Sequence, residues 1–326
     1  MRSLVTLVSV VVAVLLCGSV LGAKLQVVVA DGGSPVAGAL VRVWPGALSK
    51  NTNASGLCEF AGLTAGNYQV VASKDIGGVY KAARNDTVAM PATGILSINL
   101  ALSRAIMINE YLPRVLHWNW RYHEVITLQN AVSTRTRYED VVGTRTMGSD
   151  TVTETKISWS GTTDTFLSLE RSLAKAFAMY GEDRVTDLIL YDPPLSFENP
   201  MPEGYTFHVS TTATHTDGSP NQAITMQVTL MNFDSVTVPY GTFTDCPVLE
   251  GIQTIDGSPQ TFLMYLAKDI GIVKMFESKG AKHIRRELES FSKIKIPKLI
   301  HPRLIPKKPL FIPPVEKPME KIGQPG

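Results

Sequence analysis

The 326-residue sequence is poor in the groups that metal binding and redox chemistry require. It has three cysteines, no Cys-x-x-Cys pair, and six histidines, none of which is followed three residues later by a glutamate. We therefore expect no metal site and no other cofactor. Cys58 and Cys246 stand far apart in the sequence. A disulfide between them stays open, and buried free thiols are the interpretation that we favour.

The sequence also lacks the short motifs of common enzymes. It contains no G-x-S-x-G nucleophile turn, no H-E-x-x-H zinc helix, no phosphate-binding P-loop and no G-x-G-x-x-G dinucleotide turn. We predict that the protein is not an enzyme and has no catalytic residues. The carboxylates of glycosidases leave no short signature, so a pair of acids in a cleft stays open as an alternative.

Long apolar runs are missing except at the start of the chain. Residues 1–23 combine Arg2, an apolar run from Leu4 to Leu16, and small residues before a cleavage point after Gly22 or Ala23. This pattern predicts a signal peptide and an exported protein, located in the periplasm, at the cell surface or outside the cell. The run is too short for a transmembrane helix, so we expect no membrane span in the mature chain.

A lipid anchor at Cys17 is the alternative interpretation of the leader. A bacterial lipoprotein signal places a small residue directly before the modified cysteine, whereas this chain has Leu16 there. We therefore favour a removable signal peptide over a lipid anchor.

Residues 24–102 alternate between apolar and polar side chains, with turn residues between the alternating runs. Six or seven strands without a helical stretch predict a β-sandwich, in which Gly56 and Gly66 supply positive φ at turns. Four side chains are expected to face the second sheet: Phe60, Leu63, Tyr68 and Val70.

The same stretch carries an ordered set of turn and core residues: Asp31, Gly32, Pro35, Val36, Gly38, Ala39, Gly56, Phe60, Leu63, Gly66 and Tyr68. In this order the pattern resembles the carboxypeptidase regulatory-like family, which is close to transthyretin and to collagen-adhesin B-type repeats. The resemblance covers nearly all of residues 24–102. It implies an accessory Greek-key sandwich that serves as scaffold, spacer or binding surface, without peptidase activity.

Residues 106–278 form a second block in which Thr- and Val-rich runs predict a larger antiparallel β-domain. Within it, residues 163–181 place five side chains on one helical face: Phe166, Leu169, Leu173, Phe177 and Tyr180. This spacing predicts one helix packed against the sheet. Residues 279–293 place Ile284, Leu288 and Phe291 at helical spacing, which predicts a short terminal helix.

Two motifs of this second block are "VTVPYGTFTDCPVLEG" and "YLAKDIGIVKM". They resemble a group of uncharacterised exported bacterial β-domains, similar in outline to lipoprotein-carrier folds. The resemblance implies a curved sheet closed by a helix, and with it a carrier of a lipid or another hydrophobic molecule.

The end of the chain is basic and rich in proline. Residues 279–326 hold twelve Lys and Arg against four Asp and Glu, while residues 1–278 hold nineteen against twenty-five. Eight of the last thirty residues are proline, so residues 294–326 are predicted to be a disordered, extended tail. Export and the lack of aromatic residues between the lysines argue against a nucleic-acid partner.

The candidate ligand contacts are aromatic. Trp118, Trp120 and Tyr122 alternate along one strand and so share a face, and Trp44 stands beside Pro45. Such rows stack on sugar rings or fill a core.

We expect an exported, non-catalytic protein of mainly β structure that acts as a structural or binding module at the cell envelope. The alternatives are a periplasmic carrier of lipids or hydrophobes and a carbohydrate-binding module. The partners considered are envelope polysaccharide, lipid or another envelope protein.

Overall fold

The computed structural model describes residues 22–293, and strands account for most of them. The predicted signal peptide, apart from its last two residues, and the predicted tail at 294–326 lie outside the described residues. Within the described range, the helical element is α2 (Ile108–Tyr111). None of the helical structure there is long and apolar enough to cross a membrane.

The N-terminal region contains two sheets. The first joins four strands in the order β2-β1-β5, with β8 paired in parallel to β1: β1 (Ala23–Asp31), β2 (Ser34–Pro35), β5 (Leu57–Leu63) and β8 (Ile95–Ala101). The second has the order β16-β9-β7-β6-β3-β4: β3 (Leu40–Trp44), β4 (Leu48–Asn51), β6 (Gly66–Ile76), β7 (Val79–Met90), β9 (Ser103–Ile106) and β16 (Met201–Pro202).

Both sheets of this region contribute to one apolar core, as the alternating sequence predicts. Leu25 and Val27 of β1 and Val41 of β3 are fully buried in the same cluster. The four side chains expected to face the second sheet, Phe60, Leu63, Tyr68 and Val70, belong to that cluster too. The period-two pattern is therefore confirmed as the source of this core.

The turn glycines have the backbone conformation that their positions require. Gly56 has φ +71° and Gly66 has φ +150°. At Gly56 a Cβ atom would lie 2.5 Å from the carbonyl oxygen of Val29, so both the conformation and the space exclude a side chain there.

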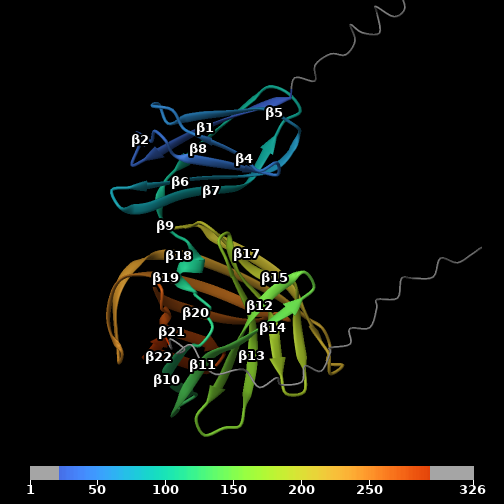
Figure 1. Cartoon of the computed structure of the whole chain (residues 1–326), viewed down its shortest axis with the longest axis vertical. Helices are drawn as coiled ribbons and strands as arrows, with labels where there is room; N and C mark the ends of the chain where they lie inside the picture. The colour runs from blue at the N-terminus through green and yellow to red at the C-terminus, as the bar shows by residue number, and fades with distance from the viewer. Residues whose placement is uncertain (1–21, 294–326) are drawn as a thin grey trace, which may run out of the picture. The chain divides into compact units, whose positions relative to one another are not determined.

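The larger region is a closed antiparallel barrel (Figure 1). Its strands are β10 (Trp118–Leu128), β11 (Ala131–Met147), β12 (Asp150–Trp159), β13 (Thr165–Leu173), β14 (Ala176–Arg184), β15 (Leu188–Glu198), β17 (Thr206–His215), β18 (Gln222–Val238), β19 (Gly241–Ile255), β20 (Ser258–Ala267), β21 (Gly271–Lys279) and β22 (Lys282–Lys293). Each strand of this list pairs with the next one in the list, and β22 pairs with β10 to close the barrel. Closure removes the free sheet edges on which other chains could pair.

Both predicted helices are wrong. Residues 163–181, expected as a helix packed on a sheet, form the hairpin of β13 and β14, whose register shifts between Leu169 and Glu170. Residues 279–293, expected as a terminal helix, contain β22. The predicted domain of residues 106–278, a sheet covered by a helix, is therefore a barrel that extends to Lys293.

Candidate binding cavity inside the barrel

The interior of the barrel contains a partly open cavity of about 320 Å³. Side chains of β11 to β15 and β18 to β22 line it, together with Met201 and residues of and beside α2. Closed barrels leave such a space when the inward side chains do not fill it. The volume lies within the range of small-molecule sites, about 300–1,000 Å³.

One side of the cavity, which we call the apolar wall, comes mainly from β14, β15, β18 to β21 and α2. Its members belong to one buried cluster: Ile108, Leu112, Phe177, Leu195, Met226, Val228, Leu249 and Phe262. Five methionines line the cavity: Met179, Met201, Met226, Met264 and Met275. Methionine side chains are flexible and polarisable, so this wall can adapt its shape to an apolar guest.

The other side, which we call the polar wall, carries charged side chains of β11, β13, β21 and β22 and Arg114. Glu124 of β10 and Arg135 of β11 pair with this group but do not line the cavity themselves. Glu124 is fully buried and accepts hydrogen bonds from Arg286 Nε at 2.8 Å, Arg135 Nε at 2.7 Å and Trp159 Nε1 at 3.0 Å. Arg286 also lies 3.6 Å from a carboxylate oxygen of Glu277.

Two further ion pairs extend the polar wall. Arg137 Nε donates to Glu139 at 2.7 Å. Arg114 forms an ion pair with Glu170, which also accepts a hydrogen bond from Ser168 Oγ at 2.9 Å. Both glutamates are only 5 % exposed. The pairs of the polar wall join four arginines to four glutamates: Arg114, Arg135, Arg137, Arg286, Glu124, Glu139, Glu170 and Glu277.

The pKa shifts of Glu124, Glu139 and Arg286 favour their charged forms. Burial alone would raise the pKa of Glu124, but the charge of Arg286 and its hydrogen bond outweigh burial and lower the pKa below its ordinary value. The same balance, with Arg137 and Arg114 as the main charges, lowers the pKa of Glu139. For Arg286, burial opposes the charge, while Glu277 and Glu124 raise the pKa above its ordinary value.

Two of the three side chains of the predicted aromatic row on β10 are buried. Trp120 and Tyr122 are each 2 % exposed and belong to a buried cluster, and Trp118 is half-buried against Phe291. Tyr122 lies near Glu139 and Arg114, and its burial raises its pKa. Trp44 is half-buried at the end of β3. A ligand contact by any of these four residues stays a prediction.

The sequence interpretation missed the charged residues of the polar wall. Their signal was present, because Glu124 stands two residues after Tyr122 and therefore on the same strand face as the aromatic row. A glutamate in line with core aromatic residues indicates an inward-facing charge. We did not treat Glu124 as a candidate.

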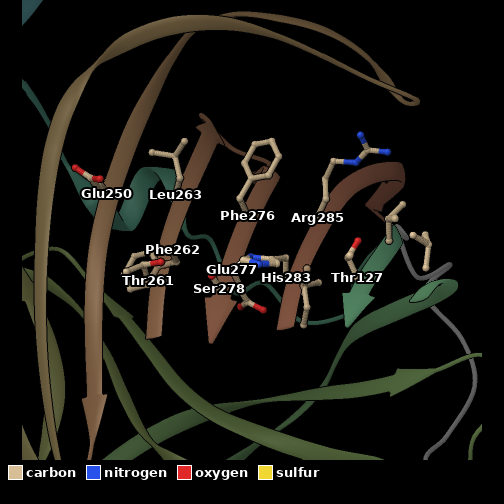
Figure 2. A pocket seen from close by; sticks show the side chains of 13 residues that line it. Thr127, Glu250, Thr261, Phe262, Leu263, Phe276, Glu277, Ser278, His283 and Arg285 are labelled. Carbon is tan, nitrogen blue, oxygen red and sulfur yellow. Dashed lines mark hydrogen bonds between the residues drawn. The ribbon is translucent and has the colours of Figure 1, made fainter. Parts of the chain in front are cut away.

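A second hollow, of about 450 Å³, lies over β19 to β22, β10 and the start of β11. Figure 2 shows Leu263, Phe276 and Arg285 on neighbouring strands of this groove. Phe262 precedes Leu263, Glu277 follows Phe276, and both Phe262 and Glu277 line the interior cavity. Because neighbouring residues of a strand face opposite sides of the sheet, Leu263 and Phe276 face outward. Phe276 is 37 % exposed, whereas the interior cavity is lined largely by side chains of a buried apolar cluster, so we take the interior as the candidate site.

Three residues near the end of β17 place potential metal-ligating atoms within 4.8 Å of one another: Asp187, His215 and Asp217. Asp187 already has protein partners for both oxygens. Its Oδ2 lies 2.6 Å from His215 Nδ1, and its Oδ1 accepts the backbone N–H of Thr216 at 2.9 Å. These contacts tie β17 to the turn before β15, and we assign the group a structural role.

Both cysteines of the described chain, Cys58 and Cys246, are buried free thiols, so the favoured interpretation is confirmed. Burial raises the pKa of each to about 11.

No family model matches the chain, and no curated protein does. Among solved structures, a protein inferred to be exported, with a YmcC-like fold, from Bacteroides fragilis shares 13 % identity at a TM-score of 0.41, covering 56 % of this chain and 99 % of that one. A protein inferred to be a lipoprotein from Parabacteroides distasonis shares 11 % identity at 0.39, covering 56 % and 98 %.

A β-barrel-like protein of a domain of unknown function from Brucella abortus shares 14 % identity at a TM-score of 0.29, covering 55 % of this chain and 98 % of that one. The first two are described as an exported protein and as a lipoprotein. The carboxypeptidase regulatory-like resemblance of residues 24–102 is not shown by these comparisons, and none assigns a function.

Proposed function

We propose that the protein is an exported, non-catalytic binding protein that carries or retains a small amphiphilic molecule inside its barrel. The observation that supports this proposal is the cavity of about 320 Å³ between an apolar and a polar wall. A location at the cell envelope rests on the predicted signal peptide.

The apolar wall is the reason to expect a guest molecule. Protein interiors are close-packed, and an unfilled cavity lacks the dispersion contacts that packing would supply. A guest that covers the apolar wall restores those contacts and removes its own apolar surface from water. The five lining methionines make the wall tolerant of guests with different shapes.

Two measurements test the binding function. Solvent extraction of the purified protein, followed by mass spectrometry, should release a small amphiphile. An environment-sensitive dye, N-phenyl-1-naphthylamine, should bind the extracted protein with increased fluorescence and be displaced by monolaurin.

A matched pair of variants locates the binding site. Val228 lines the cavity and is 2 % exposed, whereas Gln227 is the preceding, outward-facing and exposed residue of β18. Val228→Trp fills part of the cavity and should weaken dye binding at least tenfold. Gln227→Trp adds the same ring outside and should leave dye binding unchanged. If the extracted protein binds no dye and releases no amphiphile, or if Val228→Trp binds normally, the proposal is wrong.

A further inference from the structure

We propose that the cavity selects a single-chain amphiphile with an uncharged, hydroxyl-bearing head over one with an anionic or cationic head. This inference rests on the proposed function and adds the chemical class of the guest. A monoacylglycerol has the required chemistry.

The size of the cavity limits the guest to one chain. Its volume, about 320 Å³, lies at the lower end of the range for small-molecule sites, about 300–1,000 Å³. A lipid with two long acyl chains needs far more enclosed space. A single chain along the apolar wall leaves room for a compact head at the polar wall.

The charge balance of the polar wall disfavours a charged head. Its four arginines and four glutamates are already joined in ion pairs. An anionic head that binds one of these arginines competes with a buried carboxylate, and the displaced carboxylate remains buried without its partner. A cationic head has the same effect on a guanidinium. Breaking a buried pair in this way is strongly unfavourable.

A hydroxyl-bearing head avoids this cost. The carboxylates of Glu139 and Glu170 line the cavity and can accept hydrogen bonds from hydroxyl groups while they keep their arginines. Arg137 lines the cavity and uses Nε for Glu139, which leaves its terminal N–H groups for an ester carbonyl. Glu182 also lines the cavity and is paired with Arg184, so the lining carboxylates and guanidinium groups all have partners of opposite charge. The two-walled cavity therefore offers acceptors, donors and apolar surface.

Three ligands of equal chain length test the selectivity: monolaurin, laurate and dodecyltrimethylammonium. Isothermal titration calorimetry at neutral pH, below the aggregation concentration of each ligand, should give a Kd for monolaurin at least tenfold lower than for the other two. If laurate or dodecyltrimethylammonium binds as tightly as monolaurin, the charge argument is wrong although the binding function holds. If none of the three binds although the dye does, the inferred class of guest is wrong while the binding function holds. If the dye does not bind and no amphiphile is released, the proposed function itself fails.

A charge variant tests the cause of the selectivity. Glu139→Gln leaves Arg137 without its carboxylate partner and should improve laurate binding about tenfold relative to monolaurin. The matched control is Glu250→Gln, which changes an exposed glutamate of the outer groove and should leave the ratio unchanged. An unchanged ratio in folded Glu139→Gln overturns the ion-pair argument.

Should Glu139→Gln fail to fold, Arg137→Gln provides the opposite test. It leaves the Glu139 carboxylate unpaired and should shift the preference about tenfold toward dodecyltrimethylammonium. If neither variant folds, the three-ligand comparison on the unmodified protein still decides the proposal.

Discussion

The fully buried carboxylate of Glu124 permits a quantitative test of the polar wall. Glu124→Gln keeps the shape of the side chain but removes the charge that balances Arg286, which is only 6 % exposed. The remaining carboxylate near Arg286, that of Glu277, lies at 3.6 Å rather than 2.8 Å. Leaving a buried charge without its partner typically costs about 3–5 kcal/mol.

This loss is large against the stability of most folded proteins, about 5–15 kcal/mol. With a urea m-value of about 2–3 kcal/mol/M, Glu124→Gln should lower the midpoint of equilibrium unfolding by about 1–2.5 M. Trp159 donates to Glu124, so its fluorescence reports unfolding at the site. The control is Glu110→Gln, which breaks the exposed pair with Lys268 and should cost about 1 kcal/mol or less.

The dependence on pH provides a second readout for the same variant. The pKa of Glu124 is lower in the folded than in the unfolded state, so its stabilising contribution is present above the unfolded pKa. That contribution is lost as pH falls through the folded pKa. Stability below about pH 4.5 should therefore fall less steeply in Glu124→Gln than in the unmodified protein. If Glu124→Gln unfolds at the same urea concentration as the control, the polar wall is not a buried ionic network.

Two further predictions concern the strands and the thiols. Leu169→Ala should lower the free energy of unfolding by about 2–5 kcal/mol, measured by urea unfolding, because Leu169 is fully buried. Leu173→Ala should cost clearly less, because Leu173 is half-buried. Equal losses in the two variants would contradict the strand assignment. Cys58 and Cys246 should resist iodoacetamide at pH 8 until urea unfolds the chain, because burial raises the pKa of both thiols to about 11. Mass spectrometry of the peptides measures the labelling. Rapid labelling of either cysteine in the native protein would contradict its burial.

The core of residues 24–102 could be predicted from the sequence because its strands follow the simplest rule. Apolar side chains of β1 alternate inward, and the turns between strands contain glycines that are free to adopt positive φ. The expected inward residues Phe60 and Tyr68 were therefore found in the core. The sequence also predicted that the larger region consists mainly of antiparallel strands. Their closure into a barrel depends on the pairing of β10 with β22, and no local sequence pattern encodes that pairing.

The two helix predictions failed for physical reasons. In β22 the inward position between Ile284 and Leu288 is Arg286, whose charge interrupts the apolar alternation. A register shift against β10 then leaves Glu289 as an extra residue before Phe291, and the three apolar residues are left at helical spacing. In β13 three consecutive residues, Ser168 to Glu170, are buried, and in β14 the register shift leaves Tyr180 as an extra residue between Met179 and Gly181. A bulge moves the side chains that follow it to the opposite face of the strand, so apolar residues along that strand do not alternate with a period of two.

Both errors arise at the polar wall, and this coincidence supports its functional interpretation. A barrel that needed only stability could fill these inward positions with apolar residues, since replacing a buried ion pair by well-packed apolar side chains is often neutral or stabilising. This chain instead keeps Glu124, Glu139, Glu170 and Arg286 inside, each with a partner. In natural proteins, residues that conflict with the pattern expected for the fold occur mostly at functional or strained sites. Of the four buried charged residues, Glu139, Glu170 and Arg286 line the cavity, where the proposed guest would place its polar groups.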